Sequence, residues 1–193
     1  MISRLILICS GATEALRRAR FAADEPLEPK AAALASAMAA RLPRADLVWC
    51  SPALRAGQTA QALGLPGTVL PDLRDQSSGD WAGKTLTEVE ALDPMALVAW
   101  ITDPAAAPPG GESLEDVAQR TLSLLAARRS QSGTVLAITH PALIRVAATL
   151  VLGAPVQCAQ KIDIAPLTLT ELRSDGHRWH LRSLGVPGER GMR

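Results

Sequence analysis

The sequence has few cysteines, and these follow no binding pattern. Its three cysteines are Cys9, Cys50 and Cys158, and no two of them have the spacing of a CxxC motif. An odd number of widely spaced cysteines argues against both a disulfide framework and a cysteine zinc site. We expect a protein of a reducing compartment, the cytoplasm, in which Cys9 and Cys50 pack in the core as small apolar side chains.

The sequence also lacks an excess of charge and a long apolar run. Lys and Arg number 20 against 19 Asp and Glu, for a formal net charge of +1. Without a global field we expect no nucleic-acid partner and no membrane partner, and any anion site must be local. No stretch approaches the roughly 18 apolar residues of a membrane span. The run at 5–9 is too short for the apolar region of an export signal.

Hydrophobic residues make up 48% of the 193 residues, enough to bury one sizeable core. We see no internal repeat and no Pro- or Gly-rich linker that would separate two domains. The expectation is one domain over residues 1–193.

Apolar runs alternate with helical patterns along most of the chain. Buried strands are predicted at 5–9, 46–51 and 134–139, because each is a short apolar run bounded by polar residues. Helices are predicted at 30–42, 53–64, 86–100 with a break at Asp93-Pro94, after Ser113, and at 142–153. This order predicts an α/β fold of three layers, a mostly parallel sheet with helices on both faces.

Two segments depart from that alternation. The stretch "DPAAAPPGGES" at 103–113 is too rich in Pro and Gly for regular structure, and long ordered loops tend to be functional. The tail alternates apolar and polar residues in "LTLTELRS" and "HRWHLRSL", which predicts two antiparallel edge strands joined by a turn at Asp175-Gly176. Such an edge could pair two copies into a homodimer.

Polar side chains stand at or just beyond the ends of the three predicted strands. Ser10 follows the first, Arg55 lies just beyond the second, and His140 follows the third. Ligands of open α/β sheets bind beyond the carboxyl ends of the strands, so these residues are predicted to converge on one crevice.

The order of these segments resembles the histidine phosphatase superfamily, also called the phosphoglycerate mutase-like fold, over nearly the whole chain. The most specific likeness is "SPALRAGQTA" at 51–60, which is similar to the family's motif SPLxRAxQTA. The other motifs follow in the family's order: "DEPL" at 24–27, "LRDQSSGDWAG" at 73–83, "GGES" at 110–113 and "ITHPALIR" at 138–145.

The resemblance implies a phosphoryl site over the strand ends. In this family the first strand ends in Arg-His-Gly, and the histidine attacks phosphorus to form a phosphohistidine. A second histidine, two arginines and nearby donors hold the phosphoryl oxygens, and a carboxylate protonates the leaving group. No metal and no other cofactor is required, because the arginines compensate the charge. The matching positions are Arg55 for the second arginine, His140 for the second histidine, Asp75 for the acid, and Gly11, Thr13 and Glu112 for further phosphate-binding positions.

The chain departs from the family at the chemical centre. Cys9 stands in place of the first arginine and Ser10 in place of the nucleophilic histidine. A serine hydroxyl is a weak and shorter nucleophile unless a base takes its proton. Loss of the nucleophile from a cooperative catalytic unit can cost about a million-fold in rate. We expect a degenerate member that binds a small phosphorylated metabolite or inorganic phosphate and has little or no phosphatase activity.

Other interpretations stay open from the sequence. The protein could be an active phosphomonoesterase or mutase with a relocated nucleophile, or a non-catalytic interaction protein. Ser10 could be activated by His140, with Asp75 or Glu112 orienting the imidazole, although the GxSxG elbow of serine hydrolases is absent. Cys9 could be a nucleophile, but Ala15 stands where cysteine phosphatases have an arginine. Glu112 could merely cap the helix that follows it.

Overall fold

The most apolar runs of the sequence form the two central strands of the fold. The computed structural model describes residues 2–188. In it β1 (Ser3–Cys9) pairs in parallel with β4 (Gly133–Thr139), in a register that places Cys9 opposite Thr139. The residues from Leu5 to Ile8 are fully buried. Because helices cover both faces, a central strand needs apolar side chains at every position.

Six strands form one sheet in the order β3-β2-β4-β1-β5-β6. The remaining strands are β2 (Leu47–Cys50), β3 (Thr68–Val69), β5 (Thr168–Ser174) and β6 (Trp179–Pro187). Strands β1 to β4 are parallel to one another, and β5 is antiparallel to both β1 and β6. The mostly parallel sheet is therefore confirmed. The pattern analysis missed β3, which is too short to carry a hydrophobic period.

The expectation that both tail strands lie at an edge is wrong for β5. Strand β5 lies between β1 and β6, so only β6 is an edge strand. The polar residues of β5 are buried because they have partners. Arg4 and Arg173 both pair with the buried Glu171, and Thr170 Oγ1 accepts the Gly185 N–H at 3.1 Å. An alternating pattern with buried, partnered polar residues cannot be told from a solvent-facing one by sequence period alone.

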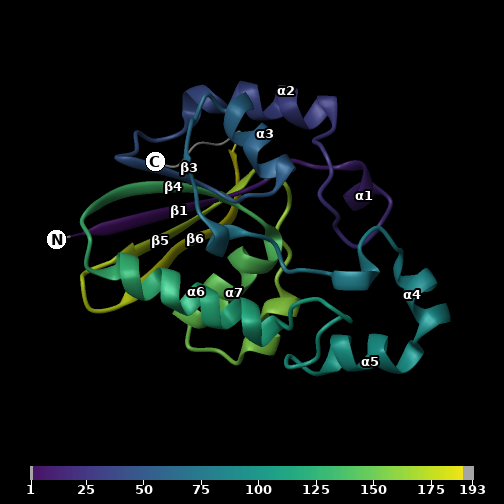
Figure 1. Ribbon diagram of the computed structural model, residues 1–193. Helices are drawn as coiled ribbons and strands as arrows, with labels where there is room; N and C mark the ends of the chain where they lie inside the picture. Colours follow the sequence, from purple (N-terminus) through teal and green to yellow (C-terminus); the bar gives the residue numbers. More distant parts are fainter. Residues whose placement is uncertain (1, 189–193) are drawn as a thin grey trace.

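Helices cover the sheet in two layers, as expected (Figure 1). On one face lie α2 (Pro29–Met38) and α3 (Leu54–Ala62), and on the other α6 (Leu114–Arg129) and α7 (Pro141–Val151). Alternate residues of β1 and β4 point to opposite faces and join two separate hydrophobic clusters, one beneath each helical layer. The shorter elements are α1 (Glu14–Arg17) and short 3-10 helices at Ala39–Arg41, Pro71–Leu73, Gly79–Trp81 and Val156–Lys161.

The local signals for helix starts and breaks are confirmed. Helix α4 (Leu86–Leu92) stops at Asp93, whose side chain caps α5 (Pro94–Thr102), with Pro94 at the first helical position. Ser113 begins α6 in a capping box with Asp116. Helices α4 and α5 lie beyond the carboxyl ends of β1 and β4 (Figure 1), packed through the rings of Phe21, Trp81 and Trp100.

Two kinds of feature are absent from residues 2–188. No helix there is long and apolar enough to cross a membrane. In the same residues, no three or more His, Cys, Asp and Glu side chains are grouped so that they could hold a metal ion.

The two loops beside the strand ends pack backbone against backbone at Gly79. Its φ is +49°, and an added Cβ would overlap the carbonyl oxygen of Pro109 and lie 2.5 Å from the nitrogen of Gly111. Gly83 also has a positive φ, +77°, but no atom lies within 4 Å of its Cβ position. The two glycines therefore differ in available space and not in the sign of φ.

We expect Gly79→Ala to destabilise the protein more than Gly83→Ala. The positive φ costs both variants about 1–2 kcal/mol, and overpacking adds about 1–3 kcal/mol for Gly79→Ala alone. Urea unfolding of the two variants and the parent protein measures the difference. Equal losses would show that the 108–111 loop moves aside at no cost.

Candidate functional site

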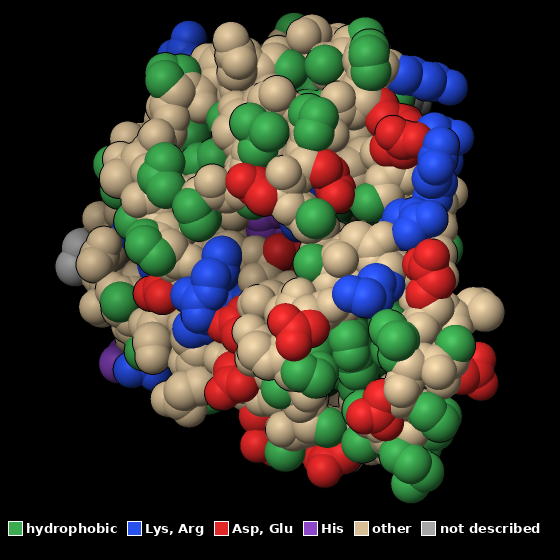
Figure 2. All heavy atoms as spheres, turned by 45° about the vertical axis from the view of Figure 1, so that its right-hand side comes forward, with side chains coloured by type: hydrophobic (Ala, Val, Ile, Leu, Met, Phe, Trp, Pro, Cys, Tyr) green, Lys and Arg blue, Asp and Glu red, His purple; other side chains and the backbone are tan. Residues whose placement is uncertain are grey.

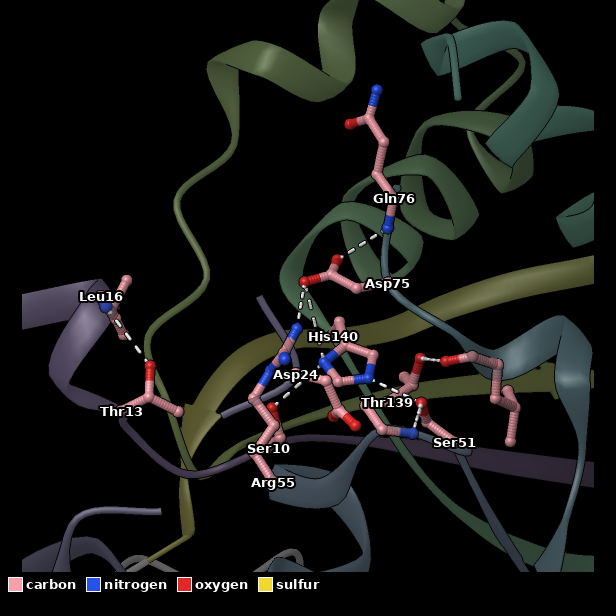
Figure 3. Close-up of polar contacts among 12 residues, drawn as sticks. Ser10, Thr13, Leu16, Asp24, Ser51, Arg55, Asp75, Gln76, Thr139 and His140 are labelled. Atoms are coloured by element: carbon pink, nitrogen blue, oxygen red, sulfur yellow. Dashed lines mark hydrogen bonds and ion pairs between the residues drawn. The ribbon is translucent and has the colours of Figure 1, made fainter. Parts of the chain in front are cut away.

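The predicted crevice residues meet at the carboxyl ends of three parallel strands (Figure 3). Ser10 follows β1, Ser51 follows β2 and His140 follows β4, while Arg55 lies in the first turn of α3. The parallel register of β1 and β4 brings Ser10 beside His140, and the Ser10 N–H donates to the Thr139 carbonyl at 2.8 Å. The convergence that the strand ends predict is present in the structure.

The imidazole of His140 is fully buried between two serine hydroxyls. Its Nδ1 lies 3.3 Å from Ser10 Oγ, and its Nε2 lies 2.7 Å from Ser51 Oγ. Ser51 Oγ also accepts the Ala53 N–H at 3.2 Å, which fixes the hydroxyl at the start of α3. The sequence analysis did not single out Ser51, although the SPLxRAxQTA motif begins with it. Ser51 holds the ring so that Nδ1 faces Ser10.

The His140 imidazole is neutral at pH 7. Burial lowers its pKa from 6.5 to about 4, the positive charges of Arg55 and Arg120 add to that effect, and Asp75 opposes it. A neutral imidazole has one ring nitrogen free to accept a proton. His140 Nδ1 can therefore accept the hydrogen bond of the Ser10 hydroxyl, but a pKa of about 4 makes the ring a weak base at pH 7.

Arg55, the predicted phosphate clamp, is already paired with the predicted acid. Its Nη2 donates to Asp75 Oδ2 at 2.7 Å, and its Nη1 donates to the Ala23 carbonyl at 2.9 Å. Asp75 Oδ2 also lies 3.8 Å from His140 Nδ1. The Arg55 side chain is 8% exposed and that of Asp75 is 22% exposed. A phosphoryl group that binds Arg55 has to share or displace this carboxylate.

Glu112 acts at a distance from this centre. Its carboxylate pairs with Arg74 and Arg120 and accepts the Ser77 N–H at 3.1 Å. Arg120 in turn donates to the carbonyls of Asp72 at 2.7 Å and Asp75 at 3.2 Å. Glu112 and Arg120 therefore hold the loop that presents Asp75.

The alternative in which Glu112 caps α6 is wrong, because Ser113 caps that helix, as the sequence predicts. Arg120 was missed, although its place on α6, three residues after the buried Val117 and four before the buried Leu124, marks a charged residue on an apolar helix face. A buried arginine at such a position requires partners, which here are Glu112 and two carbonyls.

Gly11 and Thr13 shape the loop after β1. The Gly11 N–H donates to Thr59 Oγ1 at 3.0 Å, and a Cβ at Gly11 would lie 2.9 Å from Leu27 Cδ2. Thr13 caps α1 and donates to Glu25 Oε1 at 2.8 Å. The Gly11 N–H and the Thr13 hydroxyl thus have protein partners, and within residues 2–188 neither group hydrogen-bonds the side chain of Ser10 or His140.

An open cleft of about 400 Å³ lies over the Arg55–Asp75 pair. Its lining combines small residues with polar ones, and Arg74 and Asp24 stand on its wall. Asp24 also caps α3, because its Oδ1 accepts the Leu54 N–H at 2.7 Å. Figure 2 shows this face hollowed near its centre, with acidic and basic side chains around the hollow. Ser10 and His140 are buried and are not among the residues that line this cleft.

The geometry argues against Cys9 as a nucleophile and against a serine triad built on Ser10. Burial raises the pKa of the Cys9 thiol to about 12, and Cys9 packs in the core between the sheet and α6 and α7. A thiol in that state is not a nucleophile at neutral pH. A serine triad needs a carboxylate on the ring nitrogen that faces away from the serine. Here that nitrogen faces Ser51, while Asp75 lies on the Ser10 side.

We expect the unfolding free energy to fall as the pH drops from about 6.5 to about 4. In that window unfolded His140 binds a proton and folded His140 does not, so acid favours the unfolded chain. A difference of pKa from 6.5 to about 4 corresponds to about 3 kcal/mol. Urea unfolding at steps of pH measures the slope. His140→Gln should flatten it while the exposed His177→Gln should not, and equal slopes in all three proteins would contradict the burial effect.

We expect Arg120→Met to destabilise the protein by about 2–4 kcal/mol, since it leaves Glu112 with a single cation and two carbonyls without their donor. Arg129→Met on the same helix is the matched control, because Arg129 is exposed. Urea unfolding compares the two variants. A loss no larger than that of the control would mean that water replaces the guanidinium.

Comparison with known proteins connects this site to a family. The model described as "Histidine phosphatase superfamily (branch 1)" matches residues 5–187. The chain is 36% identical over 174 residues to a glucosyl-3-phosphoglycerate phosphatase of Mycolicibacterium vanbaalenii, with 80% of this chain and 76% of that protein covered. It spans about half the length, 51%, of three further mycobacterial relatives that are 31% identical over 194 residues.

Solved structures agree with the fold. The native structure of a mycobacterial glucosyl-3-phosphoglycerate phosphatase superposes with a TM-score of 0.81 at 27% identity, over 96% of this chain and 100% of that chain. The structure of a putative α-ribazole-5'-P phosphatase from Escherichia coli superposes with a TM-score of 0.88 at 25% identity, over 99% and 98%. With the motifs in order and the polar residues gathered at the strand ends, the chain belongs to the histidine phosphatase superfamily.

Proposed function

We propose that this protein binds phosphomonoesters at the Ser10, Arg55, Asp75 and His140 cluster and hydrolyses them slowly or not at all. The observation that carries the proposal is the position of Ser10. Its hydroxyl faces His140 Nδ1, on the loop where the family has its attacking imidazole. Arg55, Asp75 and His140 therefore surround a position at which serine replaces the nucleophilic histidine of the family.

Anion binding is supported by charge and by helix direction. Arg55 offers a planar pair of donors suited to a phosphoryl group. Helices α3 and α7 both begin at the site, α7 directly after His140, so their positive ends favour an anion there. The ligand class is a small phosphorylated metabolite or inorganic phosphate, in keeping with relatives named for a phosphoglycerate derivative. Asp75 remains the group in place to protonate a leaving oxygen.

Slow turnover is supported by two substitutions at the end of β1, which replace the family's nucleophile and one of its arginines. Ser10 supplies a hydroxyl in place of an imidazole, and Cys9 supplies a neutral thiol, with a pKa of about 12, in place of a guanidinium. The transition state of phosphoryl transfer carries charge on its equatorial oxygens, which the missing arginine would stabilise. Because nucleophile and charge stabilisation act together, the combined loss reaches about a million-fold or more.

A second candidate is a phosphatase that uses Ser10 itself. The Ser10 proton would pass to neutral His140 Nδ1, 3.3 Å away, as Oγ bonds to phosphorus. The bond from phosphorus to the leaving oxygen breaks, and that oxygen takes the proton from His140 through Asp75 Oδ2, which lies 3.8 Å from Nδ1. Water then attacks the seryl phosphate, and a proton of this water passes through His140 to Ser10 Oγ as the bond from phosphorus to Oγ breaks. The direct Ser10–His140 contact favours a nucleophilic Ser10 over the interaction-protein alternative.

Expectations about location and partners stay predictions. These are the cytoplasm, the lack of nucleic-acid and membrane partners, and pairing of two copies. Strand β6 is the edge through which such pairing would run.

The deciding measurement is hydrolysis of p-nitrophenyl phosphate by the parent protein, Ser10→Ala, Ser10→His, and Ser10→His combined with His140→Gln. We expect a near-inactive parent, a gain of at least about tenfold in kcat/KM in Ser10→His, and loss of that gain when His140 is also replaced. An active parent that Ser10→Ala abolishes would establish the second candidate and overturn the first.

Binding is tested separately from turnover. Calorimetric titration with inorganic phosphate should detect binding to the parent protein. Arg55→Lys should weaken the affinity about tenfold, because lysine keeps the charge and loses the paired donors. Arg44→Lys, at an exposed position in the loop before β2, is the matched control. Absence of phosphate binding in the parent would remove the proposed function.

A further inference from the structure

The neutral imidazole of His140 carries one hydrogen, on either of its ring nitrogens, and the two tautomers give the site different chemistry. With the hydrogen on Nε2, Nδ1 accepts the Ser10 hydroxyl, as a nucleophilic Ser10 requires. With the hydrogen on Nδ1, the ring is a donor toward Ser10 and toward any oxygen bound beside it. The hydrogen bonds of the ring therefore determine what His140 can do.

Ser51 occupies Nε2 and is itself held in place. Its Oγ lies 2.7 Å from Nε2 and accepts the Ala53 N–H at 3.2 Å, at the start of α3. Ser51 and His140 are both buried. Among residues 2–188, Nε2 is the only acceptor hydrogen-bonded to the Ser51 hydroxyl. Because a buried hydroxyl hydrogen without an acceptor is costly, Ser51 donates to Nε2, which then carries no hydrogen of its own.

The lengths of the two contacts of the ring agree with this direction. Bonds donated by a hydroxyl are about 2.7–2.8 Å long, whereas bonds donated by an N–H to oxygen are closer to about 2.9–3.0 Å. The distance from Ser51 Oγ to Nε2 is 2.7 Å, and that from Ser10 Oγ to Nδ1 is 3.3 Å. The contact with Ser51 is the stronger one, and its length is that of a hydroxyl donor.

Asp75 favours the same tautomer from the other side of the ring. Its Oδ2 lies 3.8 Å from Nδ1 and 2.7 Å from Arg55 Nη2. A carboxylate beside Nδ1 attracts a hydrogen on that nitrogen. Ser10 Oγ then accepts from Nδ1, and within residues 2–188 its own hydrogen has no other partner, so it is left for a ligand. A phosphoryl oxygen that takes the place of Oδ2 would meet both the guanidinium and the Nδ1 hydrogen.

We propose that Ser51 is a positioning residue that keeps the hydrogen of the His140 ring on Nδ1, so that His140 donates to a phosphoryl oxygen and does not take the Ser10 proton. The part that concerns the ligand rests on the proposed function of the site. This tautomer supplies a donor beside Arg55 and denies Ser10 a base. Before Ser10 could be activated, the ring hydrogen would have to move to Nε2, which breaks the bond donated by Ser51.

The tautomer is measured directly by NMR of the parent protein with nitrogen-15 in its histidine rings. A ring nitrogen that carries a hydrogen differs widely in chemical shift from one that does not. The His140 signals are those that are missing from His140→Gln. At pH 7 we expect a hydrogen on Nδ1 and none on Nε2, and the opposite pattern would overturn the proposal.

Ser51→Ala tests whether Ser51 is responsible. In the proposed tautomer the Ser51 hydroxyl binds the nitrogen that a second proton would occupy, so its loss favours the charged ring. A net hydrogen bond corresponds to a change of about one in pKa. From a pKa of about 4, the charged fraction of His140 at pH 5 should therefore rise about fivefold. An equal or lower fraction would overturn the proposal, because a Ser51 that accepts from Nε2 favours the charged ring.

Two further variants separate the hydroxyl from the space it fills. Ser51→Thr keeps the hydroxyl and should restore the charged fraction of the parent. Cys50→Ala removes a buried neighbour that does not contact the ring through a hydrogen bond, and it should leave the fraction unchanged. A rise in Cys50→Ala as large as that in Ser51→Ala would assign the effect to lost packing and overturn the role of Ser51. The charges that act on the ring are the same in all variants, namely those of Asp24, Arg55, Asp75 and Arg120.

Inorganic phosphate separates this inference from the proposed function. When phosphate is added to the parent, we expect the Nδ1 signal to shift while Nδ1 keeps its hydrogen and Nε2 stays without one. If calorimetry shows phosphate binding and the Nδ1 signal does not move, the ligand contact is overturned. If no phosphate binds, the proposed function fails together with the ligand contact, and the spectrum of the free protein alone decides the role of Ser51.

Discussion

The parallel pairing of β1 with β4 is the constraint on which the site depends. It places Cys9 opposite Thr139, so the next residue of each strand, Ser10 and His140, emerges at the same height. A shift of one residue would turn every side chain of β1 to the opposite face of the sheet. The register is secured by four consecutive fully buried residues in each strand, Leu5 to Ile8 and Val135 to Ile138. The β1–β4 pairing therefore determines both the packing of the core and the relative position of Ser10 and His140.

The net charge of Arg55, Asp75 and His140 is close to zero when no ligand is bound. Arg55 is balanced by Asp75, and burial keeps His140 uncharged. The family pattern would add a guanidinium at Cys9, and the buried neutral thiol does not replace it. A bound phosphoryl dianion would thus meet fewer cations than the family's chemistry requires. Binding has to draw on the helix ends, on Arg55 released from Asp75, or on a proton taken up nearby.

The position of Asp75 depends on contacts remote in sequence. Glu112 belongs to the loop before α6, Arg120 to α6 itself, and Asp72 to the segment before Asp75, yet they form one network. A guanidinium with several donors can tie a carboxylate and two carbonyls together in a fixed geometry. The Glu112 motif thereby acts through a positioning network, and the close backbone packing at Gly79 holds the same two loops together.

The sequence by itself determined the local features of this protein. Continuous apolar runs specify the central strands, Asp93-Pro94 breaks a helix, and Ser113 caps another. The residue types at the strand ends predict the site. Each of these depends on interactions between near neighbours or on burial of a whole segment. Only the tertiary structure decided the rest. Strand β5 lies between β1 and β6, Arg4 pairs with Glu171 across 167 positions of sequence, and Arg55 is held by Asp75. Contacts between residues far apart in the chain carry no local period, so no pattern within one segment can reveal them.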